Sequence, residues 1–162
     1  MTSRINRCGI MALIKPPFAE HKIRDTKLDP SAQALTLSDI RAPDAPLVYV
    51  NQGFEKMTGY RRKDAIGQNC RFLQGPDTSP DAVAQMRAAI EHGEPLLIDV
   101  LNYRQNGTPF WNRLSLAPVA DSSGRVTHYI GIQSDITQMR LLQDRLHSIA
   151  LALAVEDKFV LD

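Results

Sequence analysis

The chain has 162 residues, of which 43% are hydrophobic and 23% are charged, and its formal net charge at pH 7 is +1. This composition excludes a disordered chain, and the length suits one globular domain with terminal extensions. The near-zero net charge excludes a general electrostatic attraction to nucleic acid or to an anionic membrane. We therefore expect neither a nucleic-acid partner nor a membrane partner.

The first 30 residues are predicted to form an N-terminal extension. Residues 1–28 contain six basic side chains against two acidic ones, which predicts a solvated basic arm. No apolar stretch approaches the roughly 20 residues that a membrane-spanning helix requires, and no signal-peptide cleavage site is present. Two cysteines, Cys8 and Cys70, cannot make a disulfide framework, and no metal-ligand spacing is found. A cytoplasmic location is expected.

Five segments carry strand signals, namely residues 34–38, 47–50, 96–104, 109–120 and 125–135. Asn106-Gly107 and Ser123-Gly124 separate the last three segments and favour hairpin turns. Strands that are grouped apart from the helices predict an α+β fold with a five-stranded antiparallel sheet.

Three helices are predicted between the second and third strands. Asn51 is a suitable N-cap for a short helix that ends at Gly59, and a second short helix is predicted over 61–66. Ser79 as N-cap, followed by Pro80, begins a longer helix.

Residues 137–162 are predicted to form an amphipathic C-terminal helix. Its apolar residues recur at alternating spacings of three and four, as in a coiled coil: Met139, Leu142, Leu146, Ile149 and Leu153. This stripe either packs against its own domain or joins two copies of the chain. We favour a homodimer formed through the sheet and the terminal helices.

Side-chain parity places carboxamides on strand faces that are expected to be buried. The residues that share these faces are Asn112, Leu114 and Leu116 in one strand, Tyr129, Gly131 and Gln133 in the next, and Asn102 near the end of the third. Buried amides must be hydrogen-bonded. They bond either to one another or to a planar ligand with a mixed donor and acceptor rim, for which Gly131 would leave room.

Three further side chains are candidates for a binding site. Arg71 and Arg87 could hold a phosphate, because a guanidinium binds it through two parallel hydrogen bonds, or they are ordinary surface arginines. Cys70 is either a small buried hydrophobe or a reactive thiol.

A ten-residue motif supports a ligand site with a reactive Cys70 over surface arginines and a structural cysteine. The string GQNCRFLQGP at 67–76 resembles the signature of light-oxygen-voltage (LOV) domains, the flavin-binding branch of the PAS superfamily. The resemblance continues through NYR at 102–104, FWN at 110–112 and YIGIQ at 129–133. It implies a PAS fold with a flavin-binding core over 31–136, in which short helices lie on one face of a five-stranded antiparallel sheet.

The resemblance assigns roles to individual residues. Cys70 is the thiol that forms a photoadduct, and Gln133 faces flavin nitrogen N5. The cofactor-binding residues are Ser38, Asn69, Arg71, Gln74, Arg87, Asn102, Asn112, Leu114, Leu116, Tyr129 and Gln133. The implied cofactor is FMN, with riboflavin or FAD as alternatives. Two positions depart from the family pattern, because Ala45 stands where Asn is frequent and Ser38 where Thr is frequent.

The implied function is blue-light sensing without enzymatic activity. Illumination joins the Cys70 sulfur to flavin carbon C4a while N5 gains a proton, and darkness reverses the reaction. The Gln133 amide is expected to rotate and to relay the change through the sheet to the terminal helices and the dimer interface. The chain resembles short LOV proteins, which lack a fused effector, so its output is expected to pass to a separate protein partner.

Three other functions remain open at this point. A PAS-type flavin redox sensor would use the same pocket without light chemistry. A dimerisation module would have amides that satisfy one another. A cysteine hydrolase would pair Cys70 with His128, but His128 has the opposite strand parity to Gln133 and is expected to point away from the pocket.

Overall fold

The computed structural model describes residues 33–156. Its elements are β1 (Ala34–Asp39), β2 (Leu47–Val50), α2 (Gln52–Thr58), α3 (Arg62–Ala65), the 3-10 helix η1 (Cys70–Leu73), α4 (Pro80–His92), β3 (Leu96–Tyr103), β4 (Pro109–Ala120), β5 (Val126–Asp135) and α5 (Thr137–Glu156). The predicted strands and helices are confirmed to within one residue at each end, apart from the last helix. The 3-10 helix around Cys70 was not predicted.

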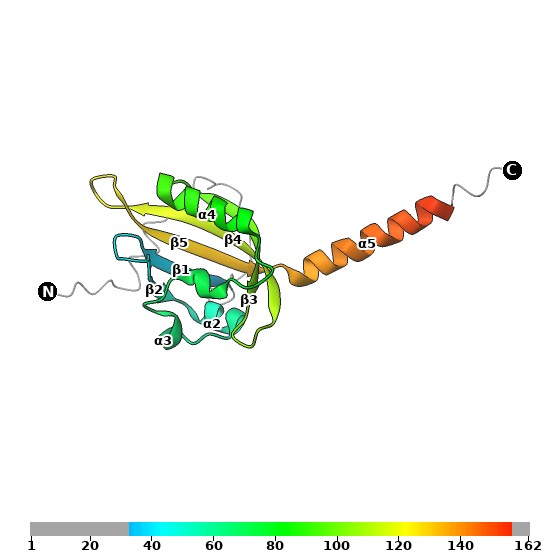
Figure 1. Ribbon diagram of the computed structural model, residues 1–162, viewed down its shortest axis with the longest axis horizontal. Coiled ribbons are helices and arrows are strands. Elements are labelled where there is room, and N and C mark those ends of the chain that lie inside the picture. The colour runs from blue at the N-terminus through cyan, green and yellow to red at the C-terminus, as the bar shows by residue number, and fades with distance from the viewer. Residues whose placement is uncertain (1–32, 157–162) are drawn as a thin grey trace, which may run out of the picture.

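The five strands form one antiparallel sheet in the order β2-β1-β5-β4-β3. Helices α2, α3 and α4 lie against the sheet, whereas α5 projects away from it (Figure 1). The predicted α+β fold is therefore correct. Because β5 is central, its inward side chains lie beside those of both β1 and β4, and this arrangement brings distant parts of the sequence to one site.

Capping residues set the ends of the helices as the sequence predicts. The Asn51 side chain accepts hydrogen bonds from Phe54 N at 3.0 Å and from Leu35 N at 2.9 Å, so it begins α2 and also ties that helix to β1. The Ser79 side chain caps α4 by accepting from Ala82 N. Gly93 ends α4 with φ of 70°, a left-handed conformation that glycine adopts without steric cost.

One part of the core packs between β1, β2 and the short helices. Its buried members are Ala34, Leu47, Val50, Phe54, Ala65 and Leu73. Phe54 is fully buried, and its ring meets Phe72 edge-on at a centroid distance of 6.5 Å. Leu73 therefore anchors the η1 segment in this core, and the residues around Cys70 are held close to the sheet.

Helix α5 leaves its apolar stripe exposed. Met139, Leu142, Leu146, Ile149 and Leu153 have exposed fractions between 39% and 60%. Only the base of the helix lies near β4, and the rest extends into solvent (Figure 1). The alternative that this stripe packs against its own domain is therefore wrong for the described part of the helix.

Some predictions fall outside the described residues. The N-terminal extension over 1–30, including the basic arm, and the last six residues of the predicted helix over 137–162 belong to this group. Among residues 33–156, no helix combines the length and the apolar character that a membrane span needs.

Candidate ligand site

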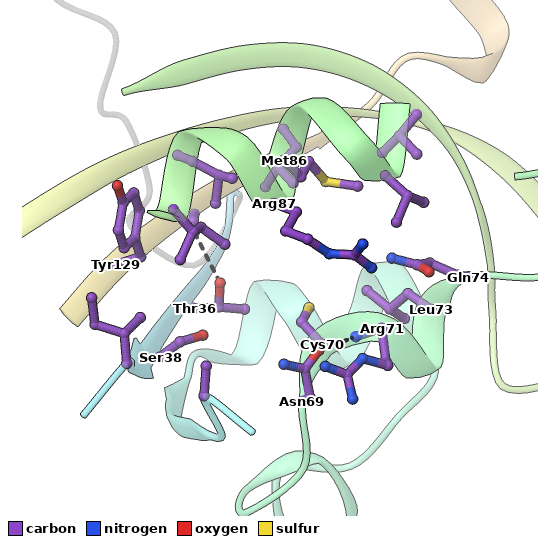
Figure 2. A pocket seen from close by; sticks show the side chains of 18 of the residues that line it. Thr36, Ser38, Asn69, Cys70, Arg71, Leu73, Gln74, Met86, Arg87 and Tyr129 are labelled. Atoms are coloured by element: carbon purple, nitrogen blue, oxygen red, sulfur yellow. Dashed lines mark hydrogen bonds between the residues drawn. The ribbon is translucent and has the colours of Figure 1, made fainter. Parts of the chain in front are cut away.

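A cavity of about 580 Å³ lies between the inner face of the sheet, helix α4 and the η1 segment. Its volume falls in the range of small-molecule pockets. All the residues that the sequence singled out for the site line it: Ser38, Asn69, Cys70, Arg71, Gln74, Arg87, Asn102, Asn112, Leu114, Leu116, Tyr129 and Gln133. Those from β1, the η1 segment and α4, together with Tyr129, are labelled in Figure 2. The residues of the site come from β1, η1, α4, β3, β4 and β5, so only the folded chain brings them together.

Three amides form a buried cluster at the sheet wall of the cavity. The Asn112 Nδ2 group donates to Asn102 Oδ1 and to Gln133 Oε1, both at 2.9 Å. Asn112 and Gln133 are each only 1% exposed, yet Asn112 Oδ1 and Gln133 Nε2 have no hydrogen-bond partner. The amides therefore satisfy one another only in part. One acceptor and one donor are left for a ligand, because leaving buried polar groups unpaired costs about 1–3 kcal/mol each.

The Cys70 thiol is held at the opposite wall by a tightly ordered turn. Gly67 enters this segment with φ of 87°, and Asn69 caps η1 by accepting from Arg71 N at 2.9 Å. The Cys70 sulfur is directed into the cavity (Figure 2). Burial raises the pKa of the Cys70 thiol to about 12. The thiol therefore keeps its proton at neutral pH, since desolvation disfavours the thiolate.

Two arginines contribute positive charge to the cavity from different elements. Arg71 extends from η1 and Arg87 from α4, and Gln74 lies near both (Figure 2). Arg71 Nη1 also makes an ion pair with Asp44 Oδ1 at 2.6 Å. Both guanidinium groups can donate hydrogen bonds to a phosphate or another oxyanion.

The apolar walls of the cavity come from the strand face that the sequence predicted and from one face of α4. Leu114 and Leu116 face the cavity from β4, and α4 supplies Val83, Met86 and Ile90. These side chains offer a flat apolar ligand two surfaces to pack against. A pocket with apolar walls and a few convergent polar groups is typical of a cofactor site.

Tyr129 has an additional structural contact that parity could not indicate. Its hydroxyl donates to the carbonyls of Ala89 at 2.9 Å and Glu94 at 3.1 Å. This ties β5 to the C-terminal end of α4, and burial raises the pKa of the Tyr129 hydroxyl. Tyr129 therefore holds α4 over the cavity as well as lining it.

Gly131 lines the cavity and also lies close against β1. An added Cβ would lie 2.5 Å from Thr36 Oγ1, so the close neighbour is β1. Thr36 pairs with Gly131 in the sheet, is 4% exposed and lines the cavity. Sequence reasoning missed Thr36, although it shares the strand parity of Ser38. It also missed Val100, which shares the parity of Asn102, and Asp44, which lies in a loop without periodicity.

His128 lies outside the cavity, as its parity predicted. Its Nε2 is 3.7 Å from Asp39 Oδ2, and its Nδ1 is 2.9 Å from Thr127 Oγ1. His128 is therefore not a base for Cys70, and a protonated thiol without a base is a weak nucleophile. The geometry contradicts the hydrolase hypothesis. Among residues 33–156 no group of three metal-ligating side chains is found either.

Comparison with known proteins agrees with the fold and the motif. The sequence model of the PAS domain family matches residues 36–138. The structure of the LOV domain from the blue-light activated histidine kinase of Erythrobacter litoralis is similar, with 44% sequence identity and a TM-score of 0.63. The match covers 65% of this chain and 96% of that structure. This chain belongs to the PAS family and is a LOV domain.

Curated relatives of this LOV domain include plant and bacterial proteins. Phototropin-2 of Oryza sativa subsp. japonica is 41% identical over 122 residues, which cover 75% of this chain and 13% of the relative. The blue-light-activated histidine kinase of Rhizobium johnstonii is 44% identical over 109 residues, which cover 67% of this chain and 32% of the relative. The chain thus matches a third or less of the length of these two proteins.

Alkylation tests the protonated state of Cys70 in this LOV domain. In a Cys8→Ser variant freed of bound ligand, iodoacetamide should modify the folded protein about a thousandfold more slowly at pH 8 than an ordinary thiol, because the thiolate is the nucleophile. The rate, followed by mass spectrometry, should rise about tenfold for each pH unit up to pH 10. The same protein in urea is the control and should react at the ordinary rate. A folded-state rate that levels off near pH 9 would contradict the raised pKa.

Proposed function

We propose that this LOV domain is a blue-light photoreceptor that binds a flavin noncovalently and uses Cys70 as its photoreactive thiol. One observation carries the proposal. Buried Asn112 Oδ1 and Gln133 Nε2 lack partners inside a cavity that also holds a half-buried, protonated thiol. The blue-light receptors among the relatives support the same conclusion.

The residues present fit a flavin. The pyrimidine edge of a flavin carries both donors and acceptors, which suits the cluster of Asn102, Asn112 and Gln133. Leu114 and Leu116 would pack against the ring system. Ser38, Asn69 and Gln74 would contact the side chain, and Arg71 and Arg87 would bind a terminal phosphate. FMN is the proposed cofactor, because two guanidinium groups line the cavity.

The photochemistry requires a thiol that is protonated and held in place. A flavin, when bound, supplies absorption of blue light and an excited ring that reacts with a nearby thiol. Cys70 would supply both parts of such an addition, namely a sulfur for the bond to ring carbon C4a and, from the S–H bond that breaks, a proton for ring nitrogen N5. No external base or oxidant is needed for this balance. Reversal in darkness returns the proton to the sulfur.

Gln133 is suited to sense this proton transfer. It is 1% exposed, its Nε2 is unpaired, and its Oε1 accepts from Asn112 Nδ2 at 2.9 Å. A ring nitrogen that becomes a donor favours rotation of the Gln133 amide, so that oxygen rather than nitrogen faces it. That rotation would remove the acceptor from Asn112. The hydrogen bonds between β4 and β5 side chains would therefore differ between dark and light.

The end of β5 provides a path from Gln133 to α5. Asp135 Oδ1 accepts from Thr137 Oγ1 at 2.6 Å, and Thr137 Oγ1 accepts from Trp111 N at 2.9 Å. The Arg140 guanidinium lies 3.7 Å above the centre of the Trp111 ring and 3.3 Å from Asp99 Oδ2. The first turns of α5 are thus joined to both β4 and β5. A change in how these strands pair can alter the direction of the helix.

Helix α5 is the proposed site of homodimerisation, together with the sheet. Its stripe from Met139 to Leu153 is exposed over several turns. Two such stripes pack efficiently as a coiled coil, because spacings of three and four keep one face in contact. We assign 31–136 to the sensor core and 137–162 to the signalling helix. A protein partner would read the helix, and binding of nucleic acid or membrane is not expected.

The visible spectrum of the purified chain tests the photoreceptor proposal. A structured band in the blue should bleach under blue light and return in darkness. The Cys70→Ala variant should keep the band and not bleach, because it lacks the sulfur that bonds to the ring. A Cys8→Ala variant is the matched control and should bleach as the original chain does. A photostable yellow protein would indicate a flavin redox sensor, and a colourless protein would indicate either loss of the cofactor or a dimerisation module.

A Gln133→Leu variant tests the relay. It should still bleach, because Cys70 is unchanged, but it should lose most of the light-induced difference in hydrogen exchange over residues 136–146. The measurement is hydrogen–deuterium exchange with mass spectrometry in darkness and under light. Gln105→Leu is the matched control, since Gln105 is exposed on a hairpin and does not line the cavity. An unchanged light response in Gln133→Leu would exclude this residue as the relay.

A Leu146→Glu variant tests the dimer. It should weaken self-association about a hundredfold, because each of two leucines loses about 1.5 kcal/mol or more of apolar burial. Sedimentation equilibrium at several protein concentrations gives the dissociation constant. His147→Glu adds a charge next to the stripe and should have little effect. A monomeric original chain, or equal dissociation constants for the original chain and Leu146→Glu, would contradict dimerisation through α5.

A further inference from the structure

The charged side chains that line the cavity cancel one another. Arg71 and Arg87 are positive, and Asp44 and Glu91 are negative. A site built to select a phosphorylated ligand by charge would keep an excess of positive charge, because a phosphate carries up to two negative charges at neutral pH. The two carboxylates therefore reduce the advantage that a phosphate gives a ligand in this cavity.

Asp44 contacts Arg71 directly, so it is the carboxylate that can reduce the preference of the cavity for a phosphorylated ligand. Its Oδ1 lies 2.6 Å from Arg71 Nη1, so it already occupies one side of that guanidinium. Its backbone carbonyl accepts from Asn69 Nδ2 at 2.6 Å, which ties the loop to the turn that carries Cys70. Asp44 and Ala45 have φ of 67° and 45°, so the loop has a defined left-handed bend. Asp44 is thus anchored beside Arg71 through both its backbone and its side chain.

A phosphate bound to Arg71 would lie close to the Asp44 carboxylate. An anion that accepts hydrogen bonds from the remaining N–H groups of Arg71 lies about 4–6 Å from the carboxylate on the same guanidinium. At that distance two like charges repel each other even in a medium as polarisable as water. Asp44 and Arg71 have side chains that are 59% and 60% exposed, so salt screens this repulsion and its effect is moderate. A ligand without a phosphate does not experience it.

We propose that Asp44 is a specificity-determining residue that lowers the preference of this site for phosphorylated over unphosphorylated flavins. The proposal rests on the flavin-binding function proposed above and adds which flavins the site accepts. Riboflavin and FMN should bind the original chain with dissociation constants within about tenfold of each other, because the ion pair with Asp44 offsets much of what Arg71 contributes.

Binding of two flavins to the full chain tests this inference. Flavin-free protein is titrated into FMN or riboflavin, and the dissociation constant is obtained from the change in flavin fluorescence. Asp44→Asn should tighten FMN binding about three- to tenfold at low salt and leave riboflavin binding unchanged. The gain should shrink in about 0.5 M salt. Asparagine tolerates the left-handed backbone at this position, so the loop should keep its shape.

Asp144→Asn is the matched control, because it removes the same charge from the projecting helix α5, away from the cavity. It should leave both dissociation constants unchanged. An unchanged FMN constant in Asp44→Asn, or equal tightening of FMN and riboflavin, would overturn the inference while leaving the photoreceptor proposal intact. If the original chain binds neither flavin, the flavin-binding proposal itself fails.

Discussion

The requirement that buried amides be hydrogen-bonded determines the chemistry of this fold. Asn102, Asn112 and Gln133 stand on adjacent strands of one sheet face, and their mutual hydrogen bonds leave one acceptor and one donor without a partner. A fully apolar wall would be easier to bury, whereas this wall keeps one buried acceptor and one buried donor unpaired unless a polar ligand completes it. The sheet therefore favours a ligand with a mixed donor and acceptor rim, and the apolar side chains around it favour a flat ligand, as in the flavin site proposed above.

The Cys70 thiol and the amide cluster differ in how the cavity affects them. Burial suppresses ionisation of Cys70, so its nucleophilicity is low until a strongly activated partner is next to it. The amide cluster, by contrast, is ready to change its hydrogen bonds without any loss of packing, because each amide can donate or accept after a rotation. In the proposed photoreceptor, a thiol that stays protonated in darkness and an amide that rotates when one proton moves would give the two states of a sensor.

The proposed relay depends on the position of β5 in the sheet. This central strand carries Gln133, ends at Asp135, and is followed directly by α5. Contacts of Arg140 and Thr137 with Trp111 also connect the helix to β4, which carries Asn112. Of the three strands that carry the amide cluster, β4 and β5 thus also hold the first turns of the helix. A rearrangement inside the cavity has a short route to a surface that is free to bind a second chain.

The sequence by itself determined the elements, their order and the identity of most site residues. Period-two alternation assigned Asn112, Leu114, Tyr129 and Gln133 to inner faces, capping residues placed the helices, and one motif identified Cys70. Periodicity reports the face of a strand, but it does not report which strand lies alongside or which side chain fills the space between. Only the tertiary structure decided that Thr36 lies against Gly131, that the Tyr129 hydroxyl holds α4, and that the stripe on α5 is exposed. The pairing of Asp44 with Arg71 was also beyond the sequence, because the two residues are 27 positions apart and a loop carries no repeating pattern from which its contacts can be deduced.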